Sequence, residues 1–313
     1  MSKKIATREA YGEALLQLGR ENLDVVALDA DLAKSTKTYD FGQNFPERFF
    51  DMGVAEQNMI GTAAGLAAAG KIPFCSSFAI FASGRAFEQV RNSVAYTSVN
   101  VKIGASHAGI TVGEDGGSHA SVEDIAIMRV LPNMTVFVPA DAVETAGAVR
   151  AAAAINGPVY IRLGRSAVPV LHGEDFQFEP GKAVVLREGL DVTIIATGIM
   201  VVAALEAVDQ LEAKGIRAGV LDIHTIKPID VDAIVNAARK TGAVVTAEEH
   251  SIIGGLGGAV AEALVEHCPV PLKRVGIPDQ FGESGTPAEL LEKFGLTPGH
   301  IVAAVEEVIT RKA

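Results

Sequence analysis

Tryptophan is absent from this sequence of 313 residues, and aromatic residues make up only 5% of it. The hydrophobic core must therefore consist mainly of Ala, Val, Ile and Leu, a composition that suits helices packed on parallel strands. Hydrophobic residues still reach 49%, which excludes an intrinsically disordered chain. The length exceeds that of one average domain and predicts two.

Cysteine and positive charge are also scarce. The two cysteines, Cys75 and Cys268, fit no disulfide or metal-binding pattern, and Cys75 lies in an apolar segment where a buried, unreactive thiol is expected. The net charge of −11 argues against nucleic acid or an anionic membrane as a partner, although a local basic cluster could still bind an anionic substrate. The first residues contain no apolar signal region, and no apolar run reaches the length of a membrane span, so we expect a cytoplasmic protein.

Short apolar runs alternate with helical patterns along the whole chain. This alternation predicts an α/β fold of two domains, each with a mostly parallel sheet flanked by helices. The expected strands are 25–32, 72–78, 101–106, 134–140 and 159–164, followed by 192–197, 217–223, 243–249 and 272–277. The expected helices are 8–20, 56–69, 83–96 and 142–154, followed by 200–214, 230–240 and 256–267.

Residues 165–190 differ in character from the rest, with Pro, Gly and charged residues but no long period. We interpret this segment as a linker with at most a short hairpin. The predicted boundaries are therefore 1–168 for the first domain, 169–190 for the linker and 191–313 for the second domain. His250, at the end of an expected strand, could face a boundary between domains or subunits.

The segment from His107 to His119 (HAGITVGEDGGSH) holds two histidines, two acids and four glycines directly after an expected strand. Glycines allow a backbone to approach a ligand closely, and imidazoles can move protons near neutral pH. A metal site is one interpretation, but no third clustered ligand is present in the sequence. A solvated loop is the plainer alternative, and we favour a functional segment.

Three further residues, Glu56, Phe78 and Phe81, are candidates for which the pattern alone favours a structural role. Glu56 opens an expected helix, where an acid ordinarily interacts with the helix dipole. Phe78 and Phe81 are three residues apart, a spacing more often found in a core than around a cofactor. The glycine-rich run 252–264 lacks the spacing of the dinucleotide fingerprint, and the sequence contains no nucleophile elbow, P-loop or zinc spacing.

Taken together and in order, these segments resemble the C-terminal half of transketolase, over essentially the whole chain. The resemblance implies a pyrimidine-binding domain followed by a transketolase C-terminal domain. The segments that carry it are Ala6-Thr7-Arg8, Asp29 to Ser35, Gly53 to Met59, Ser77 to Phe81, His107 to His119, Arg162-Leu-Gly-Arg165 and FGESGTPAELLEKFGLTP (281–298).

This resemblance implies a catalytic role for Glu56, as the acid that hydrogen-bonds N1′ of the aminopyrimidine of thiamine diphosphate. A carboxyl group there favours the imino tautomer, so that the adjacent N4′ can take the proton of the thiazolium C2. Phe81 would be the stacking face for the pyrimidine, with Phe78 beside it. Stacking is worth about 1 kcal/mol beyond burial, so these rings would set orientation more than affinity.

The resemblance also implies where the substrate binds. Arg8, Ser35, His107 and Arg165 would converge on the phosphate of a sugar, where two arginines can form charge-assisted pairs of hydrogen bonds. Asp115 and His119 would contact sugar hydroxyls, and His107 and His119 would take part in catalysis. The implied reaction is reversible transfer of a two-carbon ketol unit from a ketose phosphate to an aldose phosphate, as in the pentose phosphate pathway.

The sequence departs from a full-length transketolase in two ways. It contains no Gly-Asp-Gly motif to hold a metal and the diphosphate, so we expect no metal ligands here. Thiamine diphosphate would be shared with an N-terminal transketolase subunit that holds its diphosphate through Mg²⁺ or Ca²⁺, in a heterotetramer with two of each chain. In addition, Gly84 lies near the place of the family's third pyrimidine-stacking aromatic.

Other functions stay open at this point. A 1-deoxyxylulose-5-phosphate synthase or the β subunit of a 2-oxo acid dehydrogenase would have a similar domain and a glutamate like Glu56, but the spacing from His107 to His119 fits transketolase better. A transketolase specialised for an unusual sugar would have the same phosphate cluster. A non-catalytic assembly subunit is expected to have lost Glu56 or the histidines, and all three are present.

Overall fold

The strands form two mostly parallel sheets and a small ribbon in the computed structural model, which describes residues 3–173 and 175–312. The first sheet has the order β12 (Thr225–Lys227), β6 (Thr135–Phe137), β7 (Val159–Arg162), β5 (Lys102–Ser106), β4 (Ile72–Phe78), β2 (Val25–Asp29) and β3 (Phe49–Asp51). The second has the order β14 (Leu272–Ile277), β13 (Val244–Ser251), β10 (Val192–Ala196), β11 (Ala218–Asp222) and β9 (Val184–Arg187). Each sheet is parallel except for one antiparallel edge strand, β12 and β9 respectively, which confirms the predicted α/β class.

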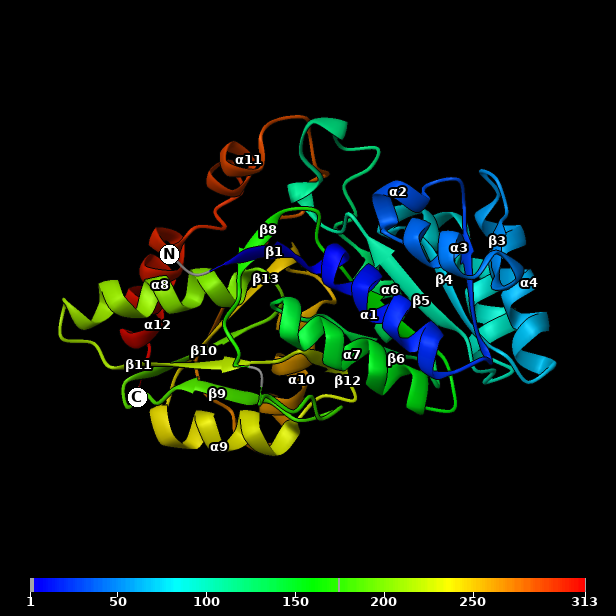
Figure 1. Ribbon diagram of the computed structural model, residues 1–313. Helices are drawn as coiled ribbons and strands as arrows, with labels where there is room; N and C mark the ends of the chain where they lie inside the picture. Colours follow the sequence, from blue (N-terminus) through cyan, green and yellow to red (C-terminus); the bar gives the residue numbers. More distant parts are fainter. Residues whose placement is uncertain (1–2, 174, 313) are drawn as a thin grey trace.

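The inner strands of the first sheet (β2, β4, β5 and β7) are buried on both faces and are apolar at most positions. Helices α1 (Thr7–Glu21) and α7 (Ala142–Ala154) lie side by side across one face (Figure 1). Val25 packs in the cluster under α1, whereas its neighbour Val26 packs with Met59 of α4 (Glu56–Ala68) on the opposite face. Successive side chains of a strand point to opposite faces, so a continuous apolar run is what a doubly covered sheet requires.

The segment predicted as an α-helix over 83–96 has a different geometry. It contains two π-helical turns, Phe81–Arg85 and Val90–Ala95, with the short helix α5 (Phe87–Gln89) between them. The amide of Ala86 donates to the carbonyl of Phe81, and that of Tyr96 to the carbonyl of Arg91, five residues back in each case. Such turns are frequent at functional sites, and the first one begins at Phe81.

The second sheet is also covered on both faces. Helices α8 (Met200–Glu212) and α12 (Pro298–Ile309) pack on one face, and α9 (Val231–Thr241) and α10 (Leu256–His267) on the other. The short helix α11 (Pro287–Lys293) begins with a capping box, in which Thr286 and Glu289 satisfy each other's backbone amides. In Figure 1 it lies near the upper loops of the first domain, and it contacts the segment Ile110–Asp115.

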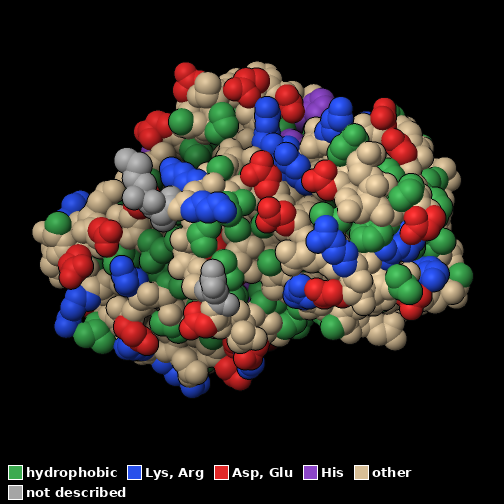
Figure 2. Space-filling model, viewed as in Figure 1, with side chains coloured by type: hydrophobic (Ala, Val, Ile, Leu, Met, Phe, Trp, Pro, Cys, Tyr) green, Lys and Arg blue, Asp and Glu red, His purple; other side chains and the backbone are tan. Residues whose placement is uncertain are grey.

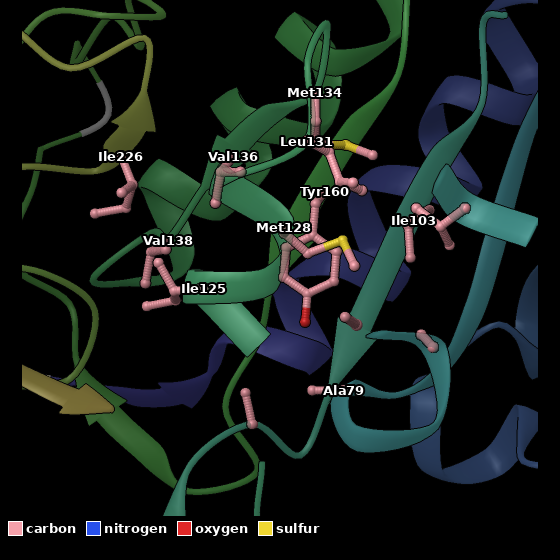
Figure 3. Close-up of a cluster of buried hydrophobic side chains, with 14 of the residues drawn as sticks. Ala79, Ile103, Ile125, Met128, Leu131, Met134, Val136, Val138, Tyr160 and Ile226 are labelled. Carbon is pink, nitrogen blue, oxygen red and sulfur yellow. The ribbon is translucent and has the colours of Figure 1, made fainter. Parts of the chain in front are cut away.

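The two domains share one hydrophobic cluster. Ile226 of β12 lies beside Val136 and Val138, next to Met128 and Tyr160 (Figure 3). Strand β12 follows the second sheet's β11 in sequence, yet it pairs with β6 of the first sheet. The domains are thus joined by backbone pairing as well as by apolar packing.

A buried polar network crosses the same boundary. The Arg162 Nε lies 2.8 Å from Asp124 Oδ2, and a second nitrogen of Arg162 donates to the carbonyl of Glu249 at 2.9 Å. His250 is fully buried, and its Nε2 accepts a hydrogen bond from the Ala126 amide of helix α6 (Asp124–Arg129) at 3.3 Å. His250 therefore lies at the domain boundary, as the sequence suggested.

The expected linker departs most from prediction, because two of its segments are strands. Strand β8 (Ala167–Pro169) pairs with β1 (Lys4–Ala6), and β9 pairs with β11 of the second sheet. They do not form a hairpin with each other. Both are too short to show a strand period, and their partners are distant in sequence. None of the helices in the described residues combines the length and apolar character that a membrane crossing needs.

Candidate active site

Glu56 is a buried carboxylate with a cationic partner. It is the first residue of α4, and its side chain is only 1% exposed. Its Oε2 accepts a hydrogen bond from Arg85 at 2.9 Å, while the Arg85 side chain is 48% exposed. A buried carboxylate needs such a partner, and this partner can be reached by solvent and by ligands.

Two phenylalanine rings lie beside this pair, at the end of β4 and at the start of the first π-helical turn. The rings of Phe78 and Phe81 are nearly parallel, with centroids 5.9 Å apart and an angle of 11° between planes. The guanidinium carbon of Arg85 lies 4.3 Å from the Phe81 centroid. Arg85 therefore makes the two contacts that the resemblance assigns to the pyrimidine: it stacks on Phe81 and it hydrogen-bonds Glu56.

Gly84 belongs to the same π-helical turn. Among the described residues, a Cβ atom added there would meet only Ile80 Cδ1, at 3.7 Å. Packing within this part of the chain therefore gives no steric reason for a glycine at that place.

Both candidate histidines join the aromatic cluster. The His107 ring stacks on Phe78 with centroids 3.8 Å apart, and the His119 ring meets Phe81 edge to face at 5.3 Å. His107 has a left-handed backbone (φ 58°), which is rare for a residue other than glycine and is concentrated at functional sites. Its Nδ1 lies 2.9 Å from the hydroxyl of Ser106.

Positive side chains surround His107. Burial, followed by the charges of Arg8 and Arg165, lowers the pKa of His107 to about 3, so the imidazole is neutral at neutral pH. Arg8 is itself affected, because burial and the charge of Arg165 lower its pKa. Lys37, which the sequence did not single out, also contributes to the lowered pKa of His107. Figure 2 shows histidine beside a group of Lys and Arg side chains near the top of the molecule.

The arginines are held by backbone carbonyls rather than by acids alone. Arg8 donates to the Ser35 carbonyl at 2.7 Å, and its Nε is buried without a hydrogen-bond partner among the described residues. Arg165 donates to the Val112 carbonyl and lies 3.7 Å from Asp115, which is exposed. Buried donors are normally paired, so the orphan Nε of Arg8 is a site where an anion could bind.

Asp29 shapes the loop that carries Ser35 and Lys37. It is fully buried and accepts hydrogen bonds from the hydroxyls of Thr36 and Thr38 at 2.6 and 2.8 Å. These bonds span the end of helix α2 (Ala33–Thr36) and the start of α3 (Tyr39–Asn44). Burial raises the pKa of Asp29 to about 6. Its role is to hold the loop, because the hydrogen bonds of its carboxylate all come from within the loop.

Two of the glycines between His107 and His119 have a packing role that the sequence did not indicate. A Cβ on Gly109 would lie 2.2 Å from the Glu249 carboxyl carbon, and one on Gly116 would lie 2.4 Å from the Ser284 hydroxyl. The Thr111 amide donates to Glu249 at 2.7 Å. These glycines let the segment pack against the second domain.

The structure thus brings the nine predicted site residues into one region, in a carboxylate and aromatic part and a basic part. The first part holds the buried carboxylate and the parallel rings, and the second holds the basic side chains with the Arg8 Nε, which is buried without a partner among the described residues. Sequence reasoning missed Arg85 and Lys37. Arg85 could have been found from its position in the sequence, because it is a cation four residues after Phe81, inside the expected helix.

Comparison with known proteins places both domains. Residues 3–170 match the transketolase pyrimidine-binding domain family, and residues 181–301 match the transketolase C-terminal domain family. SqwH of Clostridium sp. (strain MSTE9), a subunit of 6-deoxy-6-sulfo-D-fructose transketolase, is 53% identical over 97% of this chain and 95% of its own. One of the subunits of apulose-4-phosphate transketolase from Phocaeicola vulgatus is 42% identical over 98% of both chains.

A solved structure described as a split gene transketolase, an inactive β4 tetramer, is 61% identical and has a TM-score of 0.93. The match covers 99% of this chain and 100% of that one. Mouse transketolase is 41% identical over 98% of this chain but only 50% of its own length. The chain thus spans half of a single-chain transketolase and nearly all of the split-gene subunits.

Proposed function

Because this chain belongs to the transketolase family, we propose that it supplies the pyrimidine end of the cofactor site and much of the sugar-phosphate site of a two-chain transketolase. The reaction is transfer of a two-carbon ketol unit from a ketose phosphate to an aldose phosphate. The observation that carries the proposal is the gathering of a buried carboxylate, two parallel rings and two histidines beside a basic cluster.

Thiamine diphosphate, when bound, supplies the carbanion chemistry. Glu56 holds the hydrogen bond at N1′ of the pyrimidine and so sets its tautomer. Phe81 offers a flat face to the pyrimidine, and Phe78, nearly parallel to it, supports that face from within the cluster. The carboxylate is 1% exposed, and exclusion of water strengthens a hydrogen bond of this kind.

In the chain by itself, Arg85 hydrogen-bonds Glu56 and stacks on Phe81. We propose that Arg85 leaves Glu56 when the pyrimidine binds. Its side chain is half exposed, so it can turn outward into solvent. The exchange conserves one hydrogen bond to Glu56 and one stacked group on Phe81. Arg85 thereby stabilises the buried carboxylate until the cofactor and the partner chain arrive.

The basic cluster is proposed to bind the anionic end of the sugar. The Arg8 Nε is a buried donor without a partner in the described part of the chain, and Arg165 lies close enough to repel Arg8 and lower its pKa. An anion between them relieves that repulsion and accepts charge-assisted hydrogen bonds. Ser35 lies on the loop whose carbonyl holds Arg8. A net charge of −11 therefore does not prevent anion binding.

His107, His119 and Asp115 are proposed to orient the sugar between the two parts of the site. His107 is neutral, because its pKa is about 3, and can both donate and accept a hydrogen bond. His119 lies edge-on to Phe81, where it reaches the reacting end of a sugar, and moves a proton there. Asp115, exposed and 3.7 Å from Arg165, accepts from a hydroxyl.

A second chain is proposed to hold the diphosphate through Mg²⁺ or Ca²⁺, in a heterotetramer with two copies of each chain. The relative described as an inactive β4 tetramer consists of copies of the corresponding chain, which supports the idea that this half needs a partner for activity. A place in the cytoplasm and in the pentose phosphate pathway stays a prediction.

The test is Glu56→Ala in a complex reconstituted with the N-terminal subunit. We expect ketol transfer to fall by about 100-fold or more while the complex still assembles, as measured by light scattering. Glu212→Ala, on an exposed face of α8, is the matched control and keeps full activity. Unchanged turnover in Glu56→Ala contradicts the role given to this acid.

The donor sugar is tested in the same complex. Fructose 6-phosphate and 6-deoxy-6-sulfofructose place different anions on the basic cluster, and the second is the sugar named for one relative. Pyruvate tests the related 2-oxo acid chemistry. Turnover with either sugar and none with pyruvate supports the proposal, whereas turnover with pyruvate alone defeats it.

A further inference from the structure

A second cluster of titratable side chains lies outside the candidate active site. Glu144 comes from α7 of the first domain, His172 from the connection after β8, and Asp222 from the end of β11 in the second domain. Their side chains are 0%, 6% and 0% exposed. Within residues 3–173 and 175–312 this is the one group of three whose potential ligand atoms all lie within 4.8 Å of one another.

The polar atoms at the centre of this cluster lack ordinary partners. Glu144 Oε1, His172 Nε2 and both carboxylate oxygens of Asp222 are buried without a hydrogen bond to any described residue. Buried polar atoms are nearly always hydrogen-bonded, so four unsatisfied atoms in one place require an explanation. They lie opposite one another, with His172 Nε2 3.2 Å from Glu144 Oε1 and 3.8 Å from Asp222 Oδ2.

The surrounding backbone holds these side chains in place. The second oxygen of Glu144 accepts from the Ala140 amide at 2.7 Å. Asp141 accepts from the amides of Leu171 and His172 at 2.7 and 2.9 Å, which fixes the connection that carries the imidazole. The Phe176 ring packs on the His172 ring with centroids 4.1 Å apart. Metal ligands are typically oriented by outer contacts of this kind.

We infer that Glu144, His172 and Asp222 form a binding site for one divalent transition-metal ion, with zinc the best fit. Zinc binds imidazole and carboxylate at about 2.0–2.2 Å, so the ligand atoms of a tetrahedral site lie about 3.4 Å apart. The distances of 3.2 and 3.8 Å bracket that value. Both oxygens of Asp222 lack partners among the described residues, so this carboxylate can turn either oxygen to the ion, and the three side chains supply three of the four ligands.

Charge supports the same assignment. Two carboxylates and a neutral imidazole balance a divalent cation, which a buried site requires. The function we infer is structural: the ion joins the first domain, the connection and the second domain. It is separate from the Mg²⁺ or Ca²⁺ proposed for the partner chain. No local motif indicates it, because 28 and 50 residues separate the three positions along the chain (172 − 144 and 222 − 172).

The rival explanation is that protons take the place of the ion. Burial opposes a charge on His172, but the neighbouring carboxylates of Asp222 and Glu144 together outweigh it and raise the pKa of His172 to about 10. Burial, and then the charge of Glu144, raises the pKa of Asp222. His224 and Asp141 also face the cluster, and the pKa of His224 is lowered by burial. A metal ion must displace the protons on His172 and Asp222, so its affinity rises with pH.

The experiment measures zinc content and thermal stability of the full chain. The chain is stripped with a chelator, dialysed against ZnCl₂ and analysed by mass spectrometry, with circular dichroism to confirm folding. We expect one zinc per chain, a rise in Tm, and proton release that shows as a buffer-dependent heat in calorimetry. His172→Asn, which keeps a neutral polar side chain, should weaken zinc binding at least about tenfold. The matched control His267→Asn, an exposed histidine of α10, keeps it.

Two outcomes overturn the inference. A wild-type chain that remains folded and takes up essentially no zinc shows that the cluster shares protons instead. Zinc retained in a folded His172→Asn protein shows that the ion binds elsewhere. Glu144→Gln is the second variant if His172→Asn does not fold, and the same loss of zinc is expected for it.

Discussion

The pair formed by Arg85 and Glu56 offers a direct prediction about cofactor affinity. Replacing Arg85 by Met keeps the apolar length of the side chain and removes the guanidinium. If Arg85 occupies the pyrimidine position, its removal leaves Glu56 buried without a partner and leaves the face of Phe81 open. Thiamine diphosphate then binds without first displacing a competitor.

The magnitude follows from the geometry. A hydrogen bond between charged groups contributes about 1.5–3 kcal/mol, but the Arg85 side chain is 48% exposed, and screening by solvent reduces this to about 1 kcal/mol. The stacking of the guanidinium on Phe81 adds about 0.5–1 kcal/mol. Arg85→Met should therefore tighten thiamine diphosphate binding by about 10- to 30-fold, since about 1.4 kcal/mol corresponds to a factor of ten.

The assay is titration calorimetry of thiamine diphosphate into the reconstituted two-chain complex at saturating Mg²⁺. The chain has no tryptophan of its own to report by fluorescence. Arg91→Met, an exposed arginine of the same helical segment, is the control and leaves Kd unchanged. Without cofactor, the Arg85→Met chain should have a lower Tm than wild type. Markedly weaker binding in Arg85→Met refutes the reasoning, because Arg85 would then hold the cofactor rather than compete with it.

Three further predictions concern the anion site, the domain boundary and pH. Arg8→Met and Arg165→Met should each raise KM for a sugar phosphate acceptor by about 10- to 100-fold, as expected for a lost charged hydrogen bond. Turnover with glycolaldehyde, an acceptor without a phosphate, should stay unchanged. An equal loss with the sugar phosphate and with glycolaldehyde contradicts the proposed phosphate-binding role. Asp124→Asn leaves Arg162 buried without its counter-ion and should lower the free energy of unfolding, measured in urea, by about 3–5 kcal/mol. A loss under about 1 kcal/mol would show that the ion pair of Asp124 and Arg162 contributes little to stability. Burial raises the pKa of Glu249 from 4.5 to about 7. Between these two pH values the folded protein keeps a proton on Glu249 that the unfolded chain releases. Wild type should therefore lose stability relative to Glu249→Gln as pH rises from about 4.5 to about 7. A difference between these two proteins that is constant over that pH range argues against a protonated Glu249.

Much of the fold follows from local pattern, because buried strands and small-residue helices differ in period and length. The predicted bounds of β4, α7, α10 and β14 match the structure to the residue. Strands β9 and β12 could not be predicted in this way. They have four and three residues, and each exists because a distant strand is there to pair with it.

The candidate site divides in a similar way. The residues carried by ordered motifs, from Arg8 to Arg165, are brought together by the carboxyl ends of parallel strands, which meet at one edge of a sheet. The partner of Glu56 was not predictable, because the π-helical turn places Arg85 on the face of Phe81 and no local propensity marks such a turn. The packing role of Gly109 was also hidden, since Glu249 belongs to the other domain.

The most direct test of the account is the rate of hydrogen–deuterium exchange at C2 of the thiazolium ring, measured by NMR on thiamine diphosphate bound to the reconstituted complex. Wild type should exchange at least about 100-fold faster than Glu56→Gln, the size of effect expected when a positioned acid is lost, with both complexes fully assembled and loaded. Equal exchange rates in the two loaded complexes would contradict the claim that this carboxyl group activates the cofactor.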